Sequence, residues 1–311
     1  MSRLWARSRV AVGVLVLVVL LWRFGTGPFA DAWRLTTWQS VLTALLLTAI
    51  ATVANAWRWR VVARALGAPL SVRGSIAAYY RSQFLNATLP GGILGDAHRG
   101  VRHGRAAGDL SVGLRATVWD RVTGQLVQVL ALSLAIVVLP TPLQTYAPVA
   151  VVAVAVCVVA GWALVARRPA TSFVGRDLRV VLRPAVCGRV IVASGISSAA
   201  HVGVFLVAAA TVGVTAGPAD LVTVALAVLV GSAVPLNVAG WGPREGVTAA
   251  VFALVGLGSA TGLTVSVLFG VLATVATVPG IAVLLADVEA RRRRPLPVAE
   301  STPALEEAAR A

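Results

Sequence analysis

Long runs of apolar residues alternate along this chain with short clusters of arginine. Runs of about 20 apolar residues are long enough to cross a bilayer as helices, and basic residues gather at the ends of such runs. The pattern predicts an all-α, polytopic membrane protein with about eight membrane segments, at residues 10–22, 38–57, 112–139, 143–165, 190–214, 221–238, 243–258 and 263–286. The first segment is short for a crossing, and glycine and proline interrupt the seventh.

Two breaks in the apolar pattern combine proline and glycine with charged residues. The first reads NATLPGGILGDAHR over residues 86–99 and ends an apolar stretch at 75–89 before that stretch can cross the bilayer. It predicts a re-entrant or interfacial helix, a break, and a second short helix that opens at Asp96. The second break reads PLNVAGWGPREG over residues 235–246. Because unpaired backbone amides are costly in lipid, both breaks should be buried in protein or line a wet cavity.

The composition narrows the class of protein. Apolar residues make up 58% of the 311 residues and charged residues 13%, with a mean hydropathy of +0.85, which excludes an ordinary soluble domain. The formal net charge is +15 and every basic residue is arginine, so nucleic acid has to be considered as a partner. The arginines cluster between apolar runs rather than along one aromatic-rich face, which is typical of a membrane topology signal. We therefore expect no nucleic-acid partner.

The distribution of arginine predicts the orientation of the chain. With eight crossings and both termini in the cytoplasm, 24 of the 27 arginines lie on the cytoplasmic side, Arg23 and Arg34 lie outside, and Arg244 lies at the second break. We expect a cytoplasmic N-terminus at residues 1–9, a membrane domain at 10–287 and a disordered cytoplasmic tail at 288–311. The alternative for the first segment is a cleaved signal peptide with a site at residues 30–32, but this site lies far from the apolar run.

Asp96 is the main candidate residue of the first break. It follows a glycine and precedes a short helix, so it either caps that helix or forms, with arginines such as Arg99, a site for an anionic group. Asn86 lies one turn before the proline of the break. We expect Asn86 to bond backbone groups that the proline frees, in preference to a ligand.

Arg244 and Glu245 are the charged residues of the second break, and Asn237 is a further candidate there. Glu245 falls in the first turn of a predicted helix, where the positive end of the dipole favours it, so a structural role explains it as well as a binding role. Arg244 opposes that dipole but adds to an anion site made from the free amides of the same turn. A single shared site satisfies all the charges of both breaks, so Asp96, Arg99, Arg244 and Glu245 should border one cavity.

Polar side chains also recur on one face of the segment at 112–139. Arg121, Gln125 and Gln128 follow helical spacing, so this stripe should face other protein or a cavity. Asp120, directly before Arg121, is explained most simply as the interfacial counter-charge of that arginine.

His201 lies 11 residues into the segment at 190–214, which is about 16 Å along a helix and near the membrane midplane. It shares a face with Ser194 and Ser197, so it serves either a proton-relay or headgroup role or an interhelical hydrogen bond. The spacings of histidine and cysteine fit no metal site, and the chain shows no cofactor motif and no catalytic motif of a soluble enzyme. Catalysis is not indicated, although a membrane transferase could use these polar groups.

Four separated motifs occur in an order that resembles the membrane domain of bacterial lysylphosphatidylglycerol synthases. They are RWR at 58–60, SQFLNATLPGGILGDAHR at 82–99, WDRVTGQ at 119–125 and VPLNVAGWGPREG at 234–246, and the likeness covers about residues 10–287. It implies a flippase-like protein of the cytoplasmic membrane that moves an anionic, aminoacylated or polyprenyl-linked lipid between leaflets. By position, the motifs of that family fall on Gly95, Asp96 and Arg99, on Asp120 and Arg121, and on Gly240, Gly242 and Glu245.

The resemblance leaves some points open. Full-length synthases carry a large soluble domain for aminoacyl transfer, whereas only 24 residues follow Asp287 here, so we do not expect that activity. The alternative function is a membrane-embedded transferase, or an accessory subunit of one, for lipid-linked sugars, with a synthase or glycosyltransferase as partner. The oligomeric state stays open. The candidate lipid-binding residues are Asn86, Asp96, Arg99, Asp120, Arg121, Gln125, His201, Asn237, Arg244 and Glu245.

Overall fold

The computed structural model describes Val18, Trp22 and residues 25–89, 92–167, 172–232 and 241–292, and its elements are helices. Most of the predicted first segment and the residues after 292 lie outside the described residues. The elements in chain order are α2 (Gly27–Leu35), α3 (Trp38–Ala65), α4 (Val72–Thr88), α5 (Leu94–Ala106), α6 (Leu110–Val138), the 3-10 helix η1 (Pro142–Tyr146), α7 (Ala147–Arg167), α8 (Phe173–Val181), α9 (Pro184–Val212), α10 (Pro218–Ser232), α11 (Pro243–Leu254), α12 (Ser259–Val275) and α13 (Pro279–Arg292).

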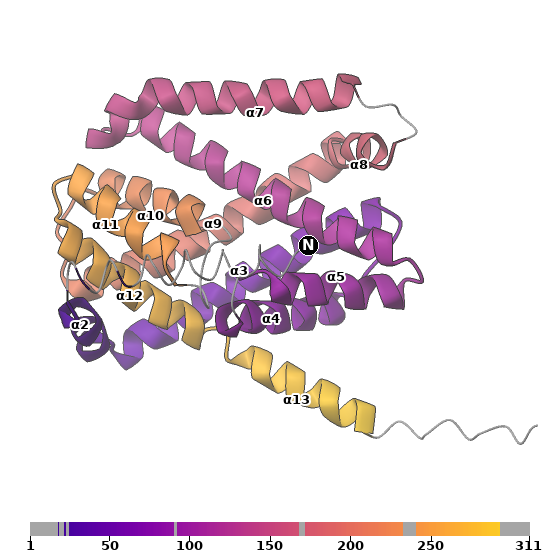
Figure 1. Ribbon diagram of the computed structural model, residues 1–311, viewed down its shortest axis with the longest axis horizontal. Coiled ribbons are helices and arrows are strands. Elements are labelled where there is room, and N and C mark those ends of the chain that lie inside the picture. Colours follow the sequence, from indigo (N-terminus) through magenta and orange to yellow (C-terminus); the bar gives the residue numbers. More distant parts are fainter. Residues whose placement is uncertain are drawn as a thin grey trace, which may run out of the picture.

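Four helical stretches of the described chain are long and apolar enough to cross a membrane. They are Trp38–Ala65, Leu110–Val138, Pro184–Val212 and Ser259–Glu289, and Pro142–Val156 and Pro218–Ser232 are shorter apolar helices. Helices α3 and α9 pack along each other through the middle of the bundle, and α7 lies at one edge of it against α6 (Figure 1). The predicted total of about eight membrane segments therefore stays a prediction.

The main hydrophobic core lies where α9, α10, α11 and α12 meet. Phe205 of α9 packs edge-on against Phe252 of α11 and Phe269 of α12, with ring centroids 6.4 and 5.8 Å apart. All three rings are buried. Aromatic pairs of this geometry contribute about 0.5–1.5 kcal/mol beyond the area they bury. This core holds α11, and with it the end of the second break, against α12.

Helices α4 and α5 form the hairpin predicted at the first break, and α5 packs closely on α6. A Cβ added to Gly113 of α6 would lie 2.3 Å from the backbone nitrogen of Gly104 in α5, so glycine is needed for this approach. At its far side the hairpin is bound to α13. Arg102 donates hydrogen bonds of 2.6 and 2.7 Å to the carboxylate of Asp287, and Arg81 forms an ion pair with the same group.

Two predictions about elements are wrong, and a third element has a turn that the sequence pattern did not predict. The arginine-rich stretch between the predicted segments at 143–165 and 190–214 was expected to be a loop, but it contains α8, whose Asp177 accepts a 3.1 Å hydrogen bond from Arg115 of α6. The eighth predicted segment lies within the candidate span Ser259–Glu289, in which the chain turns at residues 276–278, between α12 and α13. Helix α5 begins at Leu94, so Asp96 lies inside its first turn and is not its N-cap.

Candidate functional site

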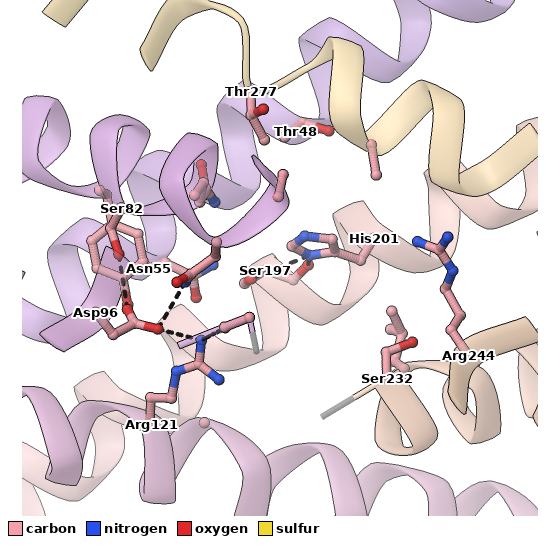
Figure 2. A pocket seen from close by; sticks show the side chains of 18 of the residues that line it. Thr48, Asn55, Ser82, Asp96, Arg121, Ser197, His201, Ser232, Arg244 and Thr277 are labelled. Carbon is pink, nitrogen blue, oxygen red and sulfur yellow. Dashed lines mark hydrogen bonds and ion pairs between the residues drawn. The ribbon is translucent and has the colours of Figure 1, made fainter. Parts of the chain in front are cut away.

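A polar cavity of about 360 Å³ lies inside the helix bundle. All four candidate membrane spans contribute to its wall, together with α4, α5, α10 and α11. Its charged and histidine side chains are Arg58, Asp96, Arg121, His201 and Arg244. Figure 2 shows Asp96 and Arg121 on one side of the cavity, Arg244 on the opposite side and His201 between them. The two breaks of the sequence therefore supply opposite sides of one cavity.

Asp96 organises the side of the cavity that belongs to the first break. Its Oδ1 accepts hydrogen bonds of 3.0 Å from Ser82 and from Arg99, and its Oδ2 accepts one of 2.9 Å from Asn86 and another from Arg121. Burial opposes the charged form, but the guanidinium groups of Arg99 and Arg121 hold the pKa of Asp96 below its ordinary value. Asp96 is therefore a carboxylate that four donors keep in one position.

Asp120 lies behind this wall and is fully buried, at 0% exposure. It accepts hydrogen bonds from Arg58 Nε at 2.8 Å, from Arg99 Nη2 at 3.0 Å and from the Tyr79 hydroxyl. The prediction that Asp120 is the counter-charge of Arg121 is therefore wrong, because three groups from other helices occupy its oxygens.

Arg99 joins the two aspartates and does not reach the cavity. Its side chain is 1% exposed, and its guanidinium carbon lies 4.4 Å from the ring centre of Trp59 and 4.1 Å from that of Tyr79. Aromatic faces attract a cation at this range. Removing one partner of a buried ion pair typically costs about 3–5 kcal/mol, so Arg99 ties α3, α4, α5 and α6 together.

Glycine makes room for this network at two positions. A Cβ at Gly95 would lie 2.0 Å from the backbone oxygen of Ser82, so only glycine lets α5 lie this close to α4. A Cβ at Gly124 of α6 would lie 2.5 Å from Nη1 of Arg58. The backbone N–H of Gly95 also donates a 2.8 Å hydrogen bond to Asn86, which confirms that Asn86 bonds backbone at the break.

The second break supplies Arg244 and Glu245 at the start of α11. Gly242 precedes this helix with a φ of 121°, which favours glycine. Glu245 accepts the Gly242 amide at 2.7 Å on Oε2, and its Oε1 accepts hydrogen bonds of 2.9 and 2.5 Å from Nε and Nη2 of Arg244. The guanidinium of Arg244 lies against Gly270 of α12, where a Cβ would be only 2.1 Å from Nη2. Glu245 thus caps the helix and orients the arginine.

His201 lies on α9 between the two sides of the cavity. Its Nδ1 is 2.8 Å from the backbone oxygen of Ser197 and 3.5 Å from the Ser197 hydroxyl. A carbonyl oxygen only accepts, so Nδ1 carries the proton of the neutral ring and Nε2 is its acceptor atom. His201 therefore lines the cavity, and its hydrogen bond is to Ser197 of its own helix rather than to a serine of another helix. Ser194 instead accepts a 3.2 Å hydrogen bond from Arg58.

The structure divides the predicted site residues by position. Those on the cavity wall are Asn86, Asp96, Arg121, Gln125, His201 and Arg244. Those buried behind the wall, in hydrogen bonds to it or to each other, are Arg99, Asp120 and Glu245. The expectation that Arg99 and Glu245 border the cavity is wrong, because their ion pairs draw them into the protein. Asn237 lies outside the described residues.

Sequence reasoning missed the polar face of α3 as part of the site. Thr48, Asn55 and Arg58 all line the cavity from this helix. The segment was predicted to end at residue 57, because an arginine usually marks the membrane boundary. The spacing of seven and then three residues places these side chains on one helical face, and this spacing was the signal that could have identified them.

The cavity and the buried network behind its wall contain more positive than negative side chains. Four guanidinium groups, from Arg58, Arg99, Arg121 and Arg244, face three carboxylates, from Asp96, Asp120 and Glu245, so one positive charge is left over. In the described part of the chain no three His, Cys, Asp or Glu side chains are grouped to hold a metal ion. The arrangement is therefore suited to an anionic group.

Comparison with known protein families agrees with these observations. Residues 8–280 match the family described as the lysylphosphatidylglycerol synthase TM region, and a search of curated proteins finds no match. The matched range includes every residue of the cavity wall. The chain is thus a multi-pass membrane protein that belongs to the family of the lysylphosphatidylglycerol synthase transmembrane region.

Proposed function

We propose that this protein moves the polar headgroup of a membrane lipid between the two leaflets through the cavity. The observation that carries the proposal is a polar cavity to which all four candidate membrane spans contribute. A charged headgroup cannot cross hydrocarbon unaided, because an unpaired charge there costs several kcal/mol. A cavity of this kind gives the headgroup polar partners while the acyl chains stay in the surrounding lipid.

Arg121 and Arg244 are the residues that would hold the headgroup phosphate. They lie on opposite sides of the cavity (Figure 2), and the side chain of Arg121 is 37% exposed while that of Arg244 is 10% exposed. A guanidinium binds phosphate through two parallel hydrogen bonds. We propose that the phosphate binds one arginine on entering the cavity and the other on leaving it.

Reconstitution in liposomes tests the proposal. Fluorescent lipids in the inner leaflet become accessible to an added quencher when the protein moves them outward. The wild-type protein should raise the rate of quenching over that of protein-free liposomes. Arg244→Gln should lower that rate more than it lowers the yield of folded protein, and Arg244→Lys should restore it only in part. Arg105→Gln is the matched control, because Arg105 is an exposed residue of α5 away from the cavity wall.

We also propose that the protein lies in the cytoplasmic membrane with both termini inside the cell. The arginine clusters support this orientation. Cys187, in the first turn of α9, is partly exposed and falls on the predicted cytoplasmic side. In a chain without Cys157, an impermeant thiol reagent should label Cys187 only after the cells are opened. Labelling of Cys187 in intact cells would contradict the proposed orientation and place this end of α9 outside the cell.

A further inference from the structure

The carboxylates around the cavity have no acceptor position left for a cationic ligand. A carboxylate offers about four acceptor positions, and four donors occupy those of Asp96. Asp120 and Glu245 are fully buried behind the wall and bind arginine. An ammonium group in the cavity would therefore meet guanidinium groups and no free carboxylate.

Amide side chains on the wall, in contrast, have unused hydrogen-bonding capacity. Asn55 of α3 and Gln125 and Gln128 of α6 line the cavity and make no hydrogen bond to another described residue. Figure 2 shows Asn55 on the same side as Asp96. Each amide can donate two hydrogen bonds and accept others, so it can pair with a hydroxyl, which donates one hydrogen bond and accepts others. This part of the wall is suited to a group rich in hydroxyls.

We infer that the lipid moved by this protein is anionic and carries an uncharged, hydroxyl-rich headgroup, such as a polyol or glycosyl phosphate. This inference rests on the proposed function and specifies its substrate class. The phosphate binds Arg121 or Arg244, and the hydroxyls bind the amides of Asn55, Gln125 and Gln128. A headgroup with a free ammonium, such as an aminoacyl group, is disfavoured because it adds positive charge to a site that already has an excess.

Three labelled lipids in the liposome assay separate these features. Phosphatidylglycerol has the phosphate and a polyol, phosphatidic acid has the phosphate alone, and lysylphosphatidylglycerol adds ammonium groups to the polyol. We expect phosphatidylglycerol to move faster than either of the others. Lysylphosphatidylglycerol moving as fast as phosphatidylglycerol would overturn the charge selectivity and leave the proposed function intact. If phosphatidic acid moves as fast as phosphatidylglycerol, the amides do not bind the headgroup hydroxyls in the way proposed.

Two further results would separate failure of the inference from failure of the proposed function. If no lipid moves, the proposed function fails and the inference fails with it. If liposomes take up soluble glycerol 3-phosphate while no lipid moves, the cavity serves a free solute, and the lipid proposal is again overturned.

A variant locates the selectivity within the cavity. Replacing Gln125 and Gln128 together by leucine should lower the rate for phosphatidylglycerol by about fivefold through lost hydrogen bonds, and should leave the rate for phosphatidic acid unchanged. Val122→Leu is the matched control, because Val122 lies on α6 with 41% exposure and is not on the cavity wall. If the double leucine variant moves phosphatidylglycerol and phosphatidic acid with equally reduced rates, the amides do not bind the headgroup hydroxyls.

Discussion

Replacing Gly270 with alanine should displace Arg244 without touching any charged residue. The new Cβ would lie 2.1 Å from Nη2 of Arg244 and 2.9 Å from its central carbon. Non-bonded heavy atoms pack at about 3.5–4.0 Å, so the guanidinium has to move by roughly 1 Å or more. That movement breaks the 2.5 Å hydrogen bond from Nη2 to Glu245. The arginine is the far end of a flexible side chain, so the helices themselves can stay in place.

The expected loss of stability is small. A hydrogen bond between charged groups contributes about 1.5–3 kcal/mol, and alanine in a helix is about 0.5–1 kcal/mol better than glycine, so the net cost of Gly270→Ala is about 1–2 kcal/mol. The effect on the rate of lipid movement should be larger than the effect on stability. If the displaced Arg244 no longer reaches a phosphate, a loss of about 1.5–3 kcal/mol in the transition state lowers the rate of lipid movement by about 10- to 100-fold.

Thermal unfolding in detergent and the liposome assay measure the two effects separately. Gly195→Ala is the matched control, because Gly195 lies within α9 and a Cβ there has no atom within 4 Å. It should stabilise the protein slightly and leave lipid movement unchanged. A Gly270→Ala protein that is folded and moves lipid at the wild-type rate would refute the role given to Arg244.

Three further changes test the buried network and the hairpin. Asp120→Asn removes the counter-charge shared by two buried arginines, and it should lower the free energy of unfolding by about 3–5 kcal/mol in detergent. Gly95→Ala places a Cβ 2.0 Å from the backbone oxygen of Ser82, so the yield of folded protein should collapse, whereas Gly188→Ala, which meets open space, should keep it. Burial lowers the pKa of His103, so stability should fall as the pH drops below about 6.5, and His103→Gln should reduce that fall in a melting series.

The hydrophobic pattern predicts much of the fold because the bilayer sets the length of each apolar run. Helix α3 begins at the predicted residue, α6 begins two residues before its predicted segment, and α9 begins six residues before its own. The hydrophobic pattern does not predict the turn between α12 and α13. Residues 276–278 are as apolar as their neighbours, and only the following proline indicates the turn. The pattern also hid α8, because arginines are frequent both in loops and on the polar face of an amphipathic helix.

The charged partners within the site could not be predicted from positions along the chain. Asp120 is adjacent to Arg121 in sequence, yet it binds Arg58, which is 62 positions away. Adjacent residues on a helix point in different directions, so the packing of α3 against α6 decides these pairs. The two breaks were easier to recognise, because glycine, proline and charge together are rare inside apolar segments.

The most direct test of headgroup passage through the cavity is to block the cavity chemically. In a chain without Cys157 and Cys187, Gln125→Cys places a thiol on the cavity wall, and Val122→Cys places one on the same helix away from it. After reaction with a bulky polar thiol reagent, the Gln125→Cys protein should lose lipid movement in liposomes, while the Val122→Cys protein should keep its rate. A fully labelled Gln125→Cys protein that moves lipid as fast as before labelling would contradict passage through this cavity.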